Sequence, residues 1–231
     1  MNGYVLVCDF SGVYSAEGFL PYLQERAALV LDFTGLEGCC CYCDEAASAR
    51  IGASLPDPLP RLRFLDSGDY HYMSHLLALK EKEPFHLVLL DHHPDDQEPA
   101  FGGVLSCGSW VKAMQEENPL VKSVLALGPE NCPEDIPEGW LEERRGERLY
   151  VSLDKDIMDR RWARTDWTQG THTLGKVKDI LRRLAEGGMH VAAVDVCGEL
   201  SVPKGAAGED LRTNYETNVE LYKHIIKLLN L

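Results

Sequence analysis

The sequence lacks three features that would point to particular classes of protein: an excess of basic residues, a long apolar segment and an N-terminal targeting segment. Lys and Arg number 23 against 37 Asp and Glu, so the formal net charge is −14. This balance argues against nucleic acid or an anionic membrane as a partner. The apolar runs are far shorter than the roughly 20 residues that a membrane span needs. Because residues 4–7 already form an apolar run with no basic region before them, we expect a soluble, cytoplasmic protein.

Paired cysteine motifs of the kind that hold structural zinc are also missing. Four of the eight cysteines lie within residues 39–43 and include the spacing Cys40-x-x-Cys43, whereas the other four are scattered singly. A zinc site usually combines two such pairs. A chain of this length does not need disulfides for stability, so we expect reduced thiols. Metal binding and a redox pair remain alternative interpretations of the cluster at 39–43.

Seven short apolar runs alternate with helical patterns along the chain. Near-continuous apolar runs are typical of strands that are covered on both faces. The alternation predicts a single α/β domain over residues 1–231, with a mostly parallel central sheet between two layers of helices. The predicted strands are 4–10, 28–33, 62–65, 85–90, 121–127, 148–153 and 190–196, and the predicted helices are 69–82, 109–117, 174–186 and 213–229.

Carboxylates and imidazoles are most densely placed directly after the predicted strand 85–90. Asp91, His93 and Asp95 follow at alternate positions, and alternate residues of an extended segment point the same way. Two carboxylates and one imidazole suit a divalent metal ion. An ordinary acidic loop is the alternative, because this pattern alone is only moderately specific.

Two further strand ends add ligands of the same kind. The strand 148–153 runs into Asp154 and Asp156, whose mutual repulsion a cation would offset. The strand 62–65 leads to His71. Because the carboxyl ends of parallel strands border one crevice, the three segments together supply enough ligands for two divalent ions.

These segments resemble the three motifs of the ureohydrolase family, which comprises arginases, agmatinases and formimidoylglutamases. The family motifs are G-G-x-H, D-x-H-x-D and S-x-D-x-D, and this chain has SGDYH at 67–71, DHHPD at 91–95 and SLDKD at 152–156. The resemblance implies the fold that arginases share with zinc deacetylases. It also implies two manganese ions, bridged by Asp91 and Asp154. Zinc is the less expected metal. The implied ligands are His71, Asp91, His93, Asp95, Asp154 and Asp156.

The activity implied by the resemblance is hydrolysis of a linear amidine or guanidino C–N bond. Two cations roughly 3.5–4 Å apart can share a water, lower its pKa and present a bridging hydroxide at neutral pH. Glu199 and Asp95 are the candidate catalytic carboxylates, with Glu199 expected to bind a cationic small-molecule substrate and to carry a proton to the leaving amine. In the family the corresponding acid lies three residues after an aspartate that matches Asp195 of this chain. Gly198 occupies that position here, and Glu199 follows it. The resemblance also allows a homo-oligomer.

The loops that shape the pocket depart from the family pattern. At 105–110 the family's Ser-Gly-Asn-x-His run has lost its histidine, and Ser106 and Cys107 are the candidate substrate contacts. Asp166 and Gln169 are further candidates, although Asp166 can equally build the turn into the next helix. Two other functions remain open: a single-zinc, deacetylase-like amidohydrolase of the same fold, and a degenerate metal-binding module that is not an enzyme.

Overall fold

The computed structural model describes residues 4–99 and 102–231. Seven strands form one sheet in the order β2-β1-β4-β9-β8-β5-β7, and every neighbouring pair is parallel. All seven predicted strands are present, which confirms the α/β prediction. They are β1 (Val5–Asp9), β2 (Leu29–Asp32), β4 (Leu62–Phe64), β5 (Phe85–Leu90), β7 (Val121–Leu127), β8 (Arg148–Asp154) and β9 (His190–Cys197).

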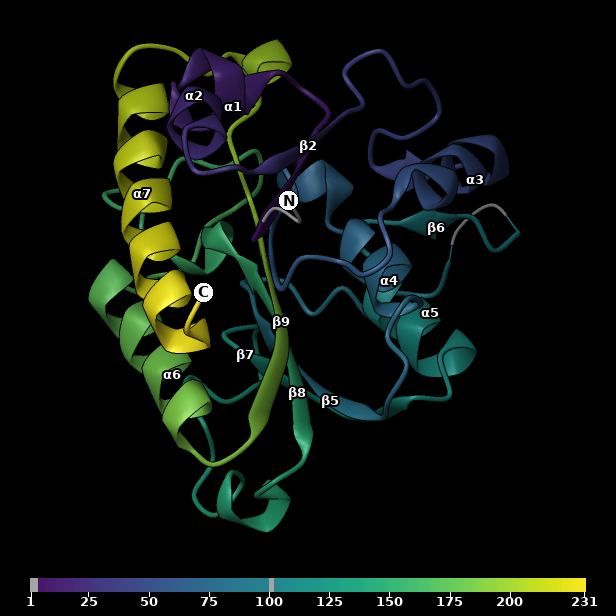
Figure 1. The fold of residues 1–231 in the computed structure, drawn as a ribbon, viewed down its shortest axis with the longest axis vertical. Helices are drawn as coiled ribbons and strands as arrows, with labels where there is room; N and C mark the ends of the chain where they lie inside the picture. Colours follow the sequence, from purple (N-terminus) through teal and green to yellow (C-terminus); the bar gives the residue numbers. More distant parts are fainter. Residues whose placement is uncertain (1–3, 100–101) are drawn as a thin grey trace.

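Helices cover both faces of this sheet, as Figure 1 shows for α6 and α7 on one side and α4 and α5 on the other. Each face has its own apolar core. Strand side chains alternate between these cores, so that Val88 and Leu90 pack on one face while Leu87 and Leu89 pack on the other. This two-sided burial explains why β5 has no polar face. The helices are α1 (Val13–Ala16), α2 (Phe19–Gln24), α3 (Glu45–Ser54), α4 (Met73–Ala78), α5 (Trp110–Glu117), α6 (Leu174–Glu186) and α7 (Glu209–Leu229).

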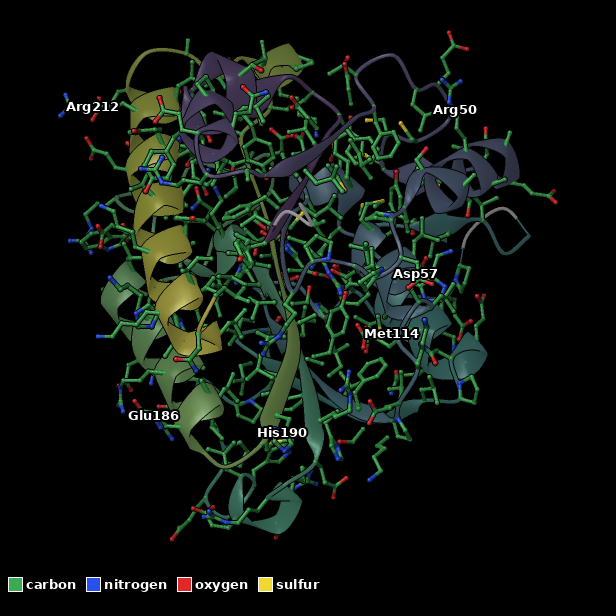
Figure 2. The ribbon with its side chains drawn as sticks, viewed as in Figure 1. Arg50, Asp57, Met114, Glu186, His190 and Arg212 are labelled. Atoms are coloured by element: carbon green, nitrogen blue, oxygen red, sulfur yellow. The ribbon has the colours of Figure 1, made fainter. Side chains whose placement is uncertain are left out.

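The helix predictions hold best where the sequence carries clear end signals. Helix α6 has the predicted bounds because the Thr173 hydroxyl accepts the amide of Lys176 at its start and Gly187 lies at its end. Helix α7 begins at Glu209 rather than at the predicted residue 213. Its polar first turn lacks the apolar pattern from which the start was predicted. The predicted helix 69–82 is divided into a 3₁₀ turn, η1 (Gly68–Tyr70), and the short α4. Figure 2 shows Glu186 of α6 and Arg212 of α7 projecting outward from the helix pair.

Several short elements near the carboxyl edge of the sheet were not predicted, among them α1, α2 and α3. Two others, β3 (Tyr42–Cys43) and β6 (Leu105–Ser106), form a small antiparallel sheet. Next to it the amide of Cys107 donates to the carbonyl of Cys41 at 2.9 Å. This pairing joins two loops that are far apart in the sequence. Within the described ranges, no helix combines the length and apolar character that crossing a bilayer requires.

Candidate metal centre

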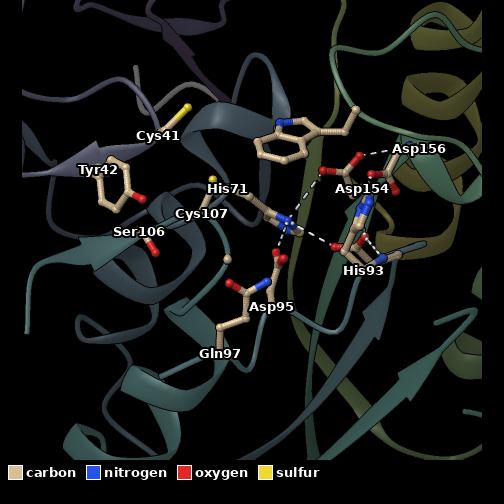
Figure 3. A pocket seen from close by; sticks show the side chains of 14 residues that line it. Cys41, Tyr42, His71, His93, Asp95, Gln97, Ser106, Cys107, Asp154 and Asp156 are labelled. Atoms are coloured by element: carbon tan, nitrogen blue, oxygen red, sulfur yellow. Dashed lines mark hydrogen bonds and ion pairs between the residues drawn. The ribbon is translucent and has the colours of Figure 1, made fainter. Parts of the chain in front are cut away.

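A cavity of about 290 Å³ lies beyond the carboxyl ends of the strands (Figure 3). All six ligands implied by the three motifs line it. They come from the segments that follow β4, β5 and β8. The rest of its wall is formed by Cys41, Tyr42, Gly68, Gln97, Ser106, Cys107, Gly108 and Trp167.

His71 is surrounded by carboxylates. Its Nδ1 lies 3.2 Å from Asp91 Oδ2, 3.1 Å from Asp95 Oδ2 and 3.5 Å from Asp154 Oδ2. Its other ring nitrogen, Nε2, lies 2.8 Å from the Ser152 hydroxyl. When Nε2 carries the proton and donates it to Ser152, Nδ1 presents a lone pair toward the three carboxylates. Partners of this kind orient the histidine ligands of metal sites.

His93 repeats this arrangement beside the first histidine. Its Nδ1 lies 2.8 Å from Asp156 Oδ2 and 3.6 Å from Asp91 Oδ1, and its Nε2 lies 2.9 Å from the Thr168 hydroxyl. The two oxygens of Asp91 therefore face different histidines. This carboxylate belongs to two separate groups of potential ligands, one with His71 and Asp154 and one with His93 and Asp156.

The electrostatics of the site reflect the crowding of like charges. Burial raises the pKa of Asp154 well above its usual value, and the carboxylates of Asp156 and Asp91 raise it further. Burial and then the Asp91 carboxylate raise the pKa of Asp156 to about 7. Burial alone would lower the pKa of His71, but the surrounding carboxylates outweigh it and raise that pKa well above its usual value. Hydrogen bonds to Asp156 and Asp91 raise the pKa of His93 to about 10. Protonated imidazoles thus offset part of the negative charge of the four aspartates, and divalent cations could replace those protons.

The ligand set fits divalent metal ions. Asp91 Oδ2 is buried, and its contact with His71 Nδ1 at 3.2 Å does not have hydrogen-bond geometry. A buried carboxylate oxygen is costly unless a donor or a cation satisfies it. Four carboxylates and two imidazoles provide mainly hard oxygen donors, which suit manganese and similar ions. Asp91 thus offers one oxygen to each of the two groups of potential ligands.

Trp110, at the start of α5, positions two of the ligands and was missed by the sequence analysis. Its indole Nε1 donates to Asp95 Oδ2 at 2.7 Å, and its ring lies against His71 with the centroids 4.8 Å apart. The backbone of Asp95 is in the left-handed region, with φ at +47°. A buried tryptophan needs an acceptor for its N–H, but the sequence does not reveal which residue supplies it.

Glu199 lies outside the cavity, which corrects the expectation that it contacts substrate. It is fully buried, forms an ion pair with Lys155 and accepts a hydrogen bond from Asn218 Nδ2 at 2.8 Å. Position 198 cannot supply the acid either. A Cβ on Gly198 would lie 2.2 Å from Asp154 Oδ1 and 2.7 Å from the Lys155 amide nitrogen, and its φ is +91°. A side chain at position 198 would therefore clash with the Asp154 carboxylate and the Lys155 backbone.

Of the four predicted substrate contacts, two line the cavity and two do not. Ser106 and Cys107 form part of its wall. The Asp166 carboxylate accepts hydrogen bonds from the amide and hydroxyl of Ser201, at 2.9 and 2.8 Å. The Gln169 amide donates to two backbone carbonyls of its own loop. Asp166 and Gln169 thus stabilise loops, which corrects their predicted role in substrate recognition.

Three of the larger wall side chains were not predicted: Tyr42, Gln97 and Trp167. Trp167 is held in place by its indole Nε1, which donates to Asp69 Oδ1 at 3.0 Å. A tryptophan shortly after the third motif is the one sequence signal that could have indicated it. Tyr42 reaches the wall only through the pairing of β3 with β6, which no local pattern in the sequence indicates.

No protein-family model matches this chain. An uncharacterized protein from Thermotoga maritima is 28% identical over 203 residues, which span 85% of this chain and 80% of that protein.

Several solved structures share the fold. Proclavaminate amidino hydrolase from Streptomyces clavuligerus superposes with a TM-score of 0.69 at 16% identity, covering 97% of this chain and 92% of that one. Arginase from Bacillus subtilis gives a TM-score of 0.60 at 12% identity, covering 98% of each chain. Formimidoylglutamase from Bacillus subtilis gives a TM-score of 0.60 at 11% identity, covering 98% of this chain and 86% of that one. The chain therefore has an arginase-like α/β fold along nearly its whole length.

Proposed function

We propose that the protein is a binuclear, manganese-dependent hydrolase that cleaves a linear amidine or guanidino C–N bond. The observation that carries the proposal is the position of Asp91, whose two carboxylate oxygens face two separate groups of potential ligands. Two ions held by these groups would lower the pKa of a shared water and supply hydroxide at neutral pH.

The chain's own residues have distinct parts in this proposal. His71, Asp91 and Asp154 would hold one ion, and Asp91, His93 and Asp156 the other. Asp95 lines the cavity beside them. Because Glu199 is buried elsewhere, we assign both carboxylate roles to Asp95. It would bind the nitrogen atoms of the amidine or guanidino group and pass a proton to the leaving amine.

The wall of the cavity supports a small cationic substrate. Apart from the metal ligands, the described lining side chains carry no formal charge at neutral pH, and Tyr42 and Trp167 contribute aromatic rings. A planar guanidinium group can lie against such rings. A free carboxylate on the substrate would meet no cationic side chain among these lining residues. Simple guanidines and agmatine-like amines therefore fit this wall better than formimidoylglutamate or an α-amino acid.

The two alternative functions make different demands on the site. A single-zinc deacetylase needs one imidazole and two carboxylates. Because Asp91 belongs to both groups, one zinc would leave either His71 and Asp154 or His93 and Asp156 without a purpose. A module with no metal to bind would have to tolerate four clustered aspartates. The doubled ligand set therefore favours two ions.

The proposal is tested by metal analysis and a substrate screen on the intact chain. Protein loaded with manganese should retain close to two ions per chain and release urea or ammonia from guanidine or agmatine, with guanidinobutyrate, which carries a free carboxylate, turned over less well. His93→Ala should lose both properties. His190→Ala, an exposed histidine at the opposite end of β9, should keep them. One zinc per chain with acetate released from an acetylated amine would favour the deacetylase. Metal without turnover of any substrate would favour the degenerate module.

A further inference from the structure

The loop that precedes α3 places cysteines on two sides. Cys39 and Cys43 are buried and contribute to an apolar core. Their thiols donate to the backbone carbonyls of Leu36 and Asp44. Cys40 and Cys41 are more exposed and turn toward the 3₁₀ turn η1. The Cys40-x-x-Cys43 spacing therefore does not create a pair of ligands.

Cys40 and Cys41 instead meet a carboxylate from another part of the chain. Their Sγ atoms and an oxygen of Asp69 all lie within 4.8 Å of one another. Cys40 Sγ is 3.5 Å from Asp69 Oδ2. Asp69 itself is buried and fixed, because it accepts the Trp167 indole N–H at 3.0 Å and lies 2.5 Å from Lys204 Nζ.

The charges around these three groups sum to a value that a divalent ion would neutralise. Two thiolates and the Asp69 carboxylate carry three negative charges. Lys204 contributes one positive charge, which it shares with Asp166, so at least two negative charges are left for a divalent ion to offset. Without an ion, burial and the Asp69 carboxylate raise the pKa of Cys41 to about 12 and also raise that of Cys40. The thiols are then protonated and the cluster stays neutral. A metal ion would displace both protons.

We propose that Cys40, Cys41 and Asp69 form a separate site for one thiophilic divalent cation such as Zn²⁺. Two thiolates and one carboxylate leave the fourth tetrahedral position open. Cys41 lines the mouth of the central cavity, as Figure 3 shows on the side away from His93. The donor set contains sulfur, whereas the central ligands are oxygen and nitrogen, so the two sites prefer different ions.

An ion at this position would add a bond between segments that a hydrogen bond and apolar packing already bring together. It would link the loop before α3 to η1, which directly precedes His71. The same carboxylate already holds Trp167. Occupancy would therefore fix one rim of the cavity without entering the central ligand set.

The experiment titrates Cd²⁺ into the reduced, manganese-loaded protein and follows the near-ultraviolet charge-transfer band of a cadmium–thiolate bond. Oxygen and nitrogen ligands give no such band, so the central site is silent. We expect the band to saturate at one Cd²⁺ per chain and to be displaced by Zn²⁺. Cys40→Ser and Cys41→Ser should each weaken binding by at least the roughly 10–100-fold that loss of an outer partner causes.

Two matched variants keep the result interpretable. Cys132→Ser alters a cysteine in a different loop and should keep the full band, and His93→Ala should keep it while losing manganese. Thermal unfolding of each variant shows whether it is folded. The proposal is overturned if the folded wild type gives no band, or if the band survives in both Cys40→Ser and Cys41→Ser.

Discussion

Replacing Gly198 with alanine tests whether this glycine is required by the metal ligand beside it. The residue follows β9 and has a φ of +91°. An added Cβ would lie 2.2 Å from Asp154 Oδ1 and 2.7 Å from the backbone nitrogen of Lys155. The nitrogen belongs to the backbone that follows β8 and cannot easily move. The Asp154 carboxylate would therefore have to rotate away from its position 3.5 Å from His71 Nδ1.

The expected cost has two parts. An L-residue with positive φ is strained by about 1–2 kcal/mol. Forcing an extra carbon into a packed interior adds about 1–3 kcal/mol. We therefore expect Gly198→Ala to lower the free energy of unfolding by about 2–5 kcal/mol. Because the displaced group is a ligand, manganese affinity should fall together with stability.

Gly205→Ala is the matched control for this change. Gly205 has a φ of +102°, but a Cβ there would meet no heavy atom within 4 Å. It should cost only the backbone strain of about 1–2 kcal/mol and leave metal content unchanged. Urea unfolding and metal analysis of both variants separate the two contributions. Equal stability and equal metal content in the two variants would refute the steric argument.

Three further changes probe the surroundings of the site. Ser152→Ala removes the partner of His71 Nε2 and should weaken manganese binding about 10–100-fold. Competition with a chelator measures the affinity, and an unchanged value would contradict the orienting role of Ser152. Lys155→Met leaves Glu199 buried without a counter-charge and should cost about 3–5 kcal/mol of unfolding free energy, most of which the double variant with Glu199→Gln should recover. Burial and then the Asp66 carboxylate raise the pKa of Asp9 to about 7, so ionisation of this group should lower stability as the pH rises from about 4 to about 7. Asp9→Asn should therefore be more stable than the wild type at a pH of about 8 but not at about 5. The same difference in urea midpoint between the two proteins at both pH values would argue against this expectation.

The parts of the fold that the sequence predicted are those in which local pattern and tertiary environment agree. Strands such as β5 are apolar on both sides because both faces are covered, so their composition alone identifies them. Helix α6 carries its own cap and its own stop. By contrast, α1 and α2 are single short turns whose stability comes from packing, and propensity is a weak guide for such segments.

The candidate metal ligands could be brought together from the sequence because all of them lie in segments that leave the carboxyl ends of parallel strands. Their exact directions could not be predicted, because His71 follows the 3₁₀ turn η1 and the backbone of Asp95 is left-handed rather than extended. The expectation for Glu199 failed because a one-residue shift after Asp195 sends the carboxylate to Lys155 instead of the cavity. Trp110 and Tyr42 were missed because their positions depend on how distant loops pair, and that information is not local.

Lys155 stands between two ligands, and its placement affects how an ion would bind. Asp154 and Asp156 face the cavity, while Lys155 between them is fully buried. Its ammonium group contacts Glu199, which follows β9, and Asn218 on α7. Lys155 therefore anchors the backbone between the two aspartates. Each carboxylate also accepts a backbone amide, Asp154 Oδ1 that of Asp156 at 2.8 Å and Asp156 Oδ1 that of His92 at 3.0 Å. Both carboxylates are thus already restricted when the chain folds. An arriving ion meets a preorganised pair and loses less affinity to ordering them.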